Sequence, residues 1–138
     1  MNISNRLRWA SKACCAVLLI GLSCVGAVSA LDKPAIQFAP GKTSVAVTGE
    51  IMGMDRDVYP IVAKAGQTMR VEVKNRFKLV LFRIQLPGTE EKYLPKAGEE
   101  DDATVWQGKL PVDGTYLIVV GAMRGKDTKY TLRVDVTK

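Results

Sequence analysis

Acidic side chains are the groups in this sequence whose spacing best suggests catalytic or metal chemistry. Asp55 and Asp57 lie two residues apart, and Glu99 to Asp102 form a continuous acidic run. Glycoside hydrolysis uses a pair of carboxylates, and Ca²⁺ prefers clustered oxygen ligands. Both groups stand in sequence typical of turns, without the apolar neighbours that would raise one carboxyl pKa, so solvated surface charge is the favoured interpretation. The acidic run also lacks the spaced Asp/Asn pattern of a calcium loop.

Composition excludes several other classes of chemistry. The sequence contains no histidine, and its three cysteines are Cys14, Cys15 and Cys24. Ser-His-Asp and Cys-His catalysis and histidine metal sites are therefore excluded. The glycines mark turns rather than a phosphate-binding loop, and the aromatic residues are too scattered for a nucleic-acid surface. We therefore expect no enzyme activity, no cofactor and no nucleic-acid partner.

Two predicted turns carry clustered cations. Lys74, Arg76 and Lys78 surround Phe77, and Arg124 and Lys126 lie in a later turn. Such turns could face an acidic partner or a membrane surface. Soluble hairpin tips are commonly charged as well, so simple solvation is the alternative interpretation.

The N-terminus has the three-part layout of a secretory signal. A basic stretch, an apolar run and a group of small residues follow one another: Arg6, Arg8 and Lys12; Ala13 to Val25; and Val28-Ser29-Ala30. This layout predicts cleavage after Ala30 and export to the periplasm or beyond. Residues 31–138 are then expected to form one domain that is not embedded in a membrane, with no cysteine left to form a disulfide.

Two alternatives to a cleaved signal are less favoured. An uncleaved membrane anchor would need a longer continuous apolar run, and glycines and serines interrupt this one. A lipoprotein would use Cys24, but Gly21 stands where such signals usually carry a large aliphatic side chain.

Alternation of apolar and polar residues predicts strands throughout the rest of the chain. In Thr68 to Lys74, for example, Met69, Val71 and Val73 share one face. The other predicted strands are Val45 to Ile51, Val58 to Lys64, Val80 to Leu86, Ala103 to Leu110, Tyr116 to Val120 and Lys129 to Val136. No helical period appears, and turns recur at the spacing typical of a sandwich. We predict an all-β, antiparallel, jelly-roll-like sandwich of about seven to eight strands.

The segments between the strands carry further expectations. Ile36 and Phe38, in the mixed stretch before the first long strand, are expected to pair on a sheet edge. The polar stretch Thr89 to Asp102 is expected to be a surface loop. Tyr59 and Tyr130 continue apolar faces, so both rings are predicted to lie in the core, as is that of Trp106.

A set of short motifs carries a family resemblance. In order they are Gly49-Glu50-Ile51-Met52-Gly53, Asp57-Val58-Tyr59, Ala63-Lys64-Ala65-Gly66-Gln67-Thr68, Leu110-Pro111, Gly114-Thr115-Tyr116 and Lys129-Tyr130-Thr131-Leu132. Together they resemble the periplasmic inhibitors of g-type (goose-type) lysozyme, from about Val45 to Val136. The same skeleton occurs in the broader group of bacterial pre-peptidase C-terminal domains, which are jelly-roll-like sandwiches.

This resemblance implies a proteinaceous inhibitor whose partner is a g-type lysozyme and whose loops block the muramidase cleft. Arg124 matches an arginine of the inhibitors' hairpin, and Met54 stands where they carry an aromatic residue. Lys126 and Arg56 complete the candidate partner-binding residues. A domain alone behind its own signal peptide favours an inhibitor. The alternatives are a non-inhibitory module that binds glycan or protein, and a structural envelope protein.

Overall fold

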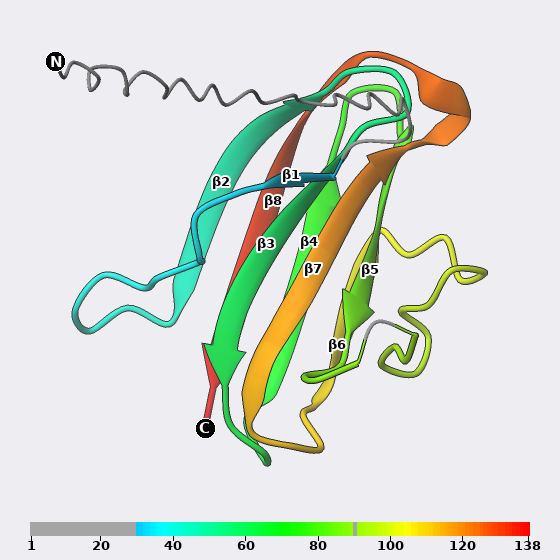
Figure 1. Cartoon of the computed structure of the whole chain (residues 1–138). Coiled ribbons are helices and arrows are strands. Elements are labelled where there is room, and N and C mark those ends of the chain that lie inside the picture. The colour runs from blue at the N-terminus through cyan, green and yellow to red at the C-terminus, as the bar shows by residue number, and fades with distance from the viewer. Residues whose placement is uncertain (1–29, 90) are drawn as a thin grey trace, which may run out of the picture.

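The computed structural model describes residues 30–89 and 91–138, which form two four-stranded β-sheets packed face to face (Figure 1). In spatial order, sheet A contains β1 (Ala30–Asp32), β3 (Arg56–Ala63), β7 (Gly114–Ala122) and β5 (Val80–Gln85). Sheet B contains β2 (Ser44–Ile51), β8 (Thr128–Thr137), β4 (Thr68–Lys74) and β6 (Val105–Lys109). The predicted all-β sandwich is confirmed. The predicted signal peptide lies, apart from Ala30, outside the described residues.

The strands follow the alternation in the sequence closely, with two departures. The short β1 pairs with β3 in parallel, whereas every other pair is antiparallel. β7 is longer than predicted, because a strand that is apolar on both faces gives no alternation to mark its ends. It lies between β3 and β5, as its two apolar faces suggest. In the described part of the chain, no helix is long and apolar enough to span a membrane.

The segment before β2 lies along the free edge of β3. Ile36 donates its backbone N–H to the carbonyl of Pro60 at 2.8 Å, and its side chain is buried. Phe38 is half-buried and packs against the core. The predicted edge pairing is therefore confirmed for Ile36.

The predicted surface loop Thr89 to Asp102 is more ordered than its polar sequence suggests. Leu94 and Ala97 are buried, and both form backbone hydrogen bonds of 3.0 Å with Ile84 of β5. The loop thereby covers an exposed edge of sheet A, which would otherwise present unpaired backbone groups. Trp106 is buried as predicted, and its indole N–H donates to the Pro95 carbonyl at 2.7 Å.

Alternate residues of the strands fill the space between the sheets. The largest fully buried side chains are Tyr116, Phe82, Ile51, Ile61, Met69, Ile84, Leu94, Leu110, Ile118, Leu132, Val71 and Val80. The hydroxyl of Tyr116 donates to the carbonyl of Val112, four residues upstream, at 2.7 Å. This tyrosine corner is a device that β-sandwiches use to fix the start of a strand.

A buried polar network links the two sheets. It consists of three residues from the sequence motifs, Asp57, Tyr59 and Tyr130, together with Lys33. Tyr130 of β8 donates to the carboxylate of Asp57 at 2.5 Å, and its oxygen lies 2.6 Å from that of Tyr59. Lys33 places its ammonium 3.6 Å from the other carboxylate oxygen, which has no hydrogen-bond partner among the described atoms. The interpretation of Asp57 as a solvated turn charge is therefore wrong, because the residue is 0% exposed and lies within β3.

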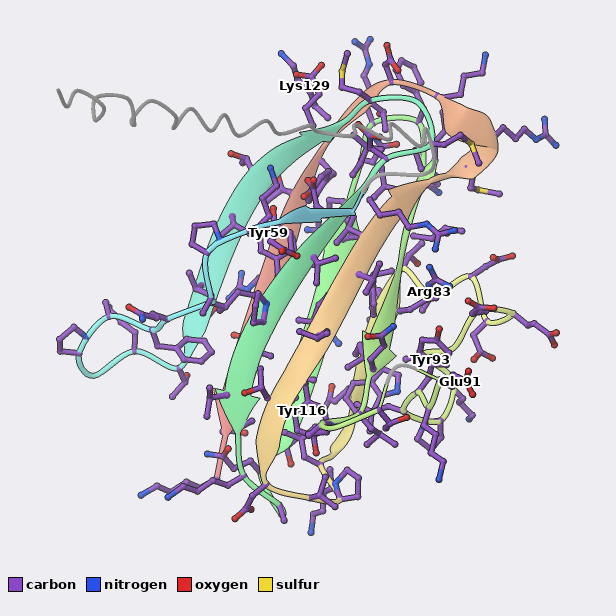
Figure 2. The ribbon with its side chains drawn as sticks, in the orientation of Figure 1. Tyr59, Arg83, Glu91, Tyr93, Tyr116 and Lys129 are labelled. Carbon is purple, nitrogen blue, oxygen red and sulfur yellow. The ribbon has the colours of Figure 1, made fainter. Side chains whose placement is uncertain are left out.

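The environment of the two tyrosines keeps their hydroxyl groups protonated. Burial raises the pKa of Tyr130 well above its ordinary value, and the hydrogen bonds to Asp57 and Tyr59 raise it further. Burial likewise raises the pKa of Tyr59. Both predicted core positions are confirmed, since Tyr59 is only 4% exposed and Tyr130 only 3%. Figure 2 labels Tyr59 on β3.

Gly49 makes room for this network, and replacing it by alanine is expected to destabilise the protein. A Cβ atom at this position would lie 2.5 Å from the Tyr130 hydroxyl oxygen, closer than real contacts allow. Displacing the ring should lower the free energy of unfolding by about 1–3 kcal/mol. Urea unfolding followed by circular dichroism measures this loss. Thr48→Ala, at the neighbouring exposed position, is the control, and a Gly49→Ala protein as stable as wild type would contradict the packing.

Candidate functional site

Three loops come together at one end of the sandwich, at the top of Figure 1. They are residues 52–55 between β2 and β3, residues 75–79 between β4 and β5, and residues 123–127 between β7 and β8. We call this surface the loop end. Figure 2 shows Lys129 at this end and Tyr116 toward the other.

The first and third of these loops are in direct contact. The backbone N–H of Gly53 donates to the carboxylate of Asp127 at 2.7 Å. The sulfur of Met54 would lie 3.0 Å from a Cβ atom on Gly125, so the thioether packs over this glycine. Met54 nevertheless remains 60% exposed and offers an apolar surface beside the hairpin.

The second loop is joined to the third through Asn75 and the backbone. The N–H of Met123 donates to the carbonyl of Leu79 at 2.7 Å. The Asn75 amide donates to the Thr128 hydroxyl and to the Lys129 carbonyl, both at 2.6 Å. These bonds tie the two hairpin tips together although they lie far apart in the sequence.

The third loop presents its two cations to solvent. Met123–Gly125 form a single 3₁₀ turn, in which Arg124 has φ 58° and ψ 26°. This left-handed conformation is uncommon for a residue with a side chain. Arg124 and Lys126 are both exposed, and neither forms an ion pair within residues 30–89 and 91–138. A guanidinium and an ammonium without protein partners are free to bind a carboxylate of another molecule.

Arg56 lies on the flank rather than at the tip. It is the first residue of β3, is half-buried, and pairs in register with Gly121. Its side chain lines a hollow of about 170 Å³ on the outer side of sheet A, together with Arg83 and Glu99. The structure thus groups Met54, Arg124 and Lys126 at the loop end and places Arg56 beside them.

The acidic run on that flank is engaged in local contacts. Glu99 forms an ion pair with Arg83, and the Tyr93 hydroxyl donates to the Glu99 carboxylate at 3.2 Å. The guanidinium of Arg83 lies 5.8 Å from the centre of the Tyr93 ring, and Figure 2 labels both residues. Asp101 accepts a hydrogen bond from the backbone N–H of Gly98 at 2.7 Å. Among the described residues, no three acidic side chains gather as a metal site would require.

The cations of the second loop are evident from the sequence, but their connection with the third loop is not. The missing residue is Asn75, whose side-chain oxygen also accepts from the backbone N–H groups of Phe77 and Leu79 at 3.1 and 2.8 Å. An asparagine that opens a hairpin turn is a known signal for such a bond. Its bonds to β8, however, depend on the tertiary fold.

No protein-family model matches the sequence. A relative from Escherichia coli (strain K12), described as an inhibitor of g-type lysozyme, is 30% identical over 128 residues. The alignment covers 88% of this chain and 93% of that protein.

Solved structures with the same fold include two that bear on the sequence resemblance. A periplasmic inhibitor of g-type lysozyme from Aeromonas hydrophila superposes with a TM-score of 0.67 at 34% identity, covering 80% of this chain and 100% of that one. The pre-peptidase C-terminal domain of a collagenase from Bacillus anthracis superposes with a TM-score of 0.55 at 16% identity, covering 77% and 94%. The second likeness shows the fold alone.

Proposed function

The chain belongs to the family of periplasmic inhibitors of g-type lysozyme, and we propose that it uses its loop end to block the catalytic cleft of such a lysozyme. As a member of this family, the protein is a periplasmic lysozyme inhibitor and not an enzyme. The observation that carries this function is the relationship to the Escherichia coli inhibitor, which extends over 88% of the chain.

The chemistry of the loop end supports the proposed blocking mechanism. A lysozyme cleft contains a carboxyl group that acts as general acid. Arg124 can bind a carboxylate through two parallel hydrogen bonds, and Lys126 adds a second positive charge beside it. Met54, packed against the same hairpin, offers apolar contact at the rim. A hairpin seated in this way would occupy the space that the glycan substrate needs.

Inhibition of lysozyme by the purified protein tests the proposal. The protein is expressed with its N-terminal signal sequence so that the cell exports it. We propose that cleavage after Ala30 then leaves residues 31–138. It is then titrated against g-type, c-type and i-type lysozymes acting on peptidoglycan suspensions. We expect g-type activity to fall to near zero at a small molar excess of inhibitor.

Two measurements make this assay decisive. Circular dichroism establishes that the sample is folded, and a gel-filtration shift of the mixture reports a complex with the lysozyme. A folded protein that leaves every g-type enzyme fully active at large excess would refute the proposed function. Such a result would favour a glycan-binding or protein-binding module of the pre-peptidase kind.

A further inference from the structure

The tip of the β4–β5 loop carries the chain's most exposed aromatic ring among the described residues. Phe77 is 66% exposed, whereas the buried aromatic rings of the core are almost fully covered. Met52 and Met54 of the neighbouring loop are 52% and 60% exposed. Single exposed apolar residues are common on soluble proteins, but here three lie in loops at the same end of the sandwich.

Hydrogen bonds order the backbone of the tip that carries the ring. The Asn75 side chain accepts hydrogen bonds from Phe77 and Leu79, which closes the turn around the ring. Lys78 adopts φ 55°, in the left-handed region that tight turns often use. A contact residue that is already ordered loses little conformational entropy on binding.

Two further hydrogen bonds join the loop that carries Phe77 to the segment that carries Arg124. Asn75 donates to the Lys129 carbonyl, and Met123 donates to the Leu79 carbonyl. The two tips therefore form one unit that projects from the same end of the sandwich (Figure 1). A partner that receives the 123–127 hairpin in a cleft brings its surface beside that cleft close to the 75–79 tip.

The charges around the ring match an acidic surface. The Arg76 guanidinium lies 5.4 Å from the centre of the Phe77 ring, a cation–π distance. Arg76 and Lys78 are exposed, and neither forms an ion pair within the described residues. Arginine is one of the residue types that most often dominate the binding energy of protein interfaces, and phenylalanine is enriched in them.

We propose that Phe77 and Arg76 form a second contact arm, which docks on the lysozyme surface beside the cleft that Arg124 enters. This inference rests on the proposed function and extends it to a loop that contains none of the motifs that carry the family resemblance. An anionic membrane is the competing partner for a basic aromatic tip. A protein surface is favoured because hydrogen bonds join the tip to the 123–127 hairpin, which we propose enters the cleft.

Phe77→Ala tests the second arm, with Val62→Ala as the matched control. Val62 is 72% exposed and lies near the other end of β3, away from the loop end. We expect Phe77→Ala to raise the inhibition constant for a g-type lysozyme by about 10- to 100-fold, and Val62→Ala to change it less than about twofold. The melting temperatures of both variants should stay close to that of wild type, because both side chains are exposed.

Each outcome separates the second arm from the proposed function. If wild type inhibits and Phe77→Ala inhibits equally well, the second arm is overturned while the function stands. If wild type inhibits no g-type lysozyme, the proposed function and the arm that depends on it both fall. If Phe77→Ala loses binding only to phosphatidylglycerol vesicles, with inhibition unchanged, the ring serves a membrane and the inference is overturned.

Discussion

Replacing Tyr130 by alanine is expected to lower the free energy of unfolding by about 3–5 kcal/mol. The ring is 3% exposed, and it fills the space over Gly49, a residue that has no side chain of its own. Its hydroxyl is also the donor to the buried Asp57 carboxylate, so alanine leaves both a cavity and an under-bonded carboxylate. Urea unfolding monitored by circular dichroism measures the loss. Tyr59→Ala, on the facing sheet, is expected to have a similar effect.

Tyr130→Phe separates the two causes, because phenylalanine keeps the ring and removes the hydroxyl. We expect it to cost about 1–3 kcal/mol, the penalty for leaving a buried polar group without its partner. Tyr93→Phe is the control, since that ring is half-buried in a loop and bonds to an exposed glutamate. A loss below about 1 kcal/mol for Tyr130→Ala would place the ring at the surface and contradict the network.

The strands of this fold were predictable because most of them are apolar on one face only. In β4, Met69, Val71 and Val73 are buried as their spacing indicates. The role of Asp57 was missed because a charged residue was read as solvent-exposed by type. Its position was nevertheless informative, since it precedes Tyr59 and Ile61 on the same face of β3. Extending the alternation by one residue would have placed the carboxylate inside the protein.

Other parts of the fold depend on contacts that no local pattern records. The loop after β5 is polar and interrupted by proline and glycine, yet its backbone pairs with the edge of β5 at Ile84. The parallel pairing of β1 with β3 likewise depends on where the sandwich leaves an open edge. Such pairings are set by which backbone groups remain free once the core has formed.

The candidate site was predictable only in part for the same reason. Arg124 and Met54 were identified through the resemblance and Lys126 through its charge in the same turn, and the structure brings the three together. The contribution of the 75–79 loop requires the hydrogen bond between Met123 and Leu79, which joins residues far apart in the chain. Arg56 was expected in a turn, but β3 begins at Arg56, two residues before the predicted start at Val58, and the side chain lies on the flank.

Replacing Arg124 by alanine is expected to weaken binding to a g-type lysozyme by about 2–5 kcal/mol, which is roughly 30-fold to several thousand-fold in the inhibition constant. The loss has this size if the guanidinium forms a desolvated pair with a carboxylate of the cleft, because removing it leaves that charge buried without a partner. The melting temperature should hardly change, since Arg124 is exposed and forms no ion pair within the described residues. Inhibition titrations and thermal unfolding measure the two effects separately.

Two further variants identify what the guanidinium contributes. Arg124→Lys keeps the charge but cannot form the two parallel hydrogen bonds, so it should restore binding only in part. Lys64→Ala removes one exposed cation from the turn at the opposite end and corrects for the change in net charge. If the cations acted only through long-range attraction, Arg124→Ala and Lys64→Ala would raise the inhibition constant by the same small factor. This increase would disappear in high salt. A large loss confined to Arg124, and persisting in salt, requires a direct contact in the cleft, whereas unchanged inhibition by Arg124→Ala would remove this residue from the site.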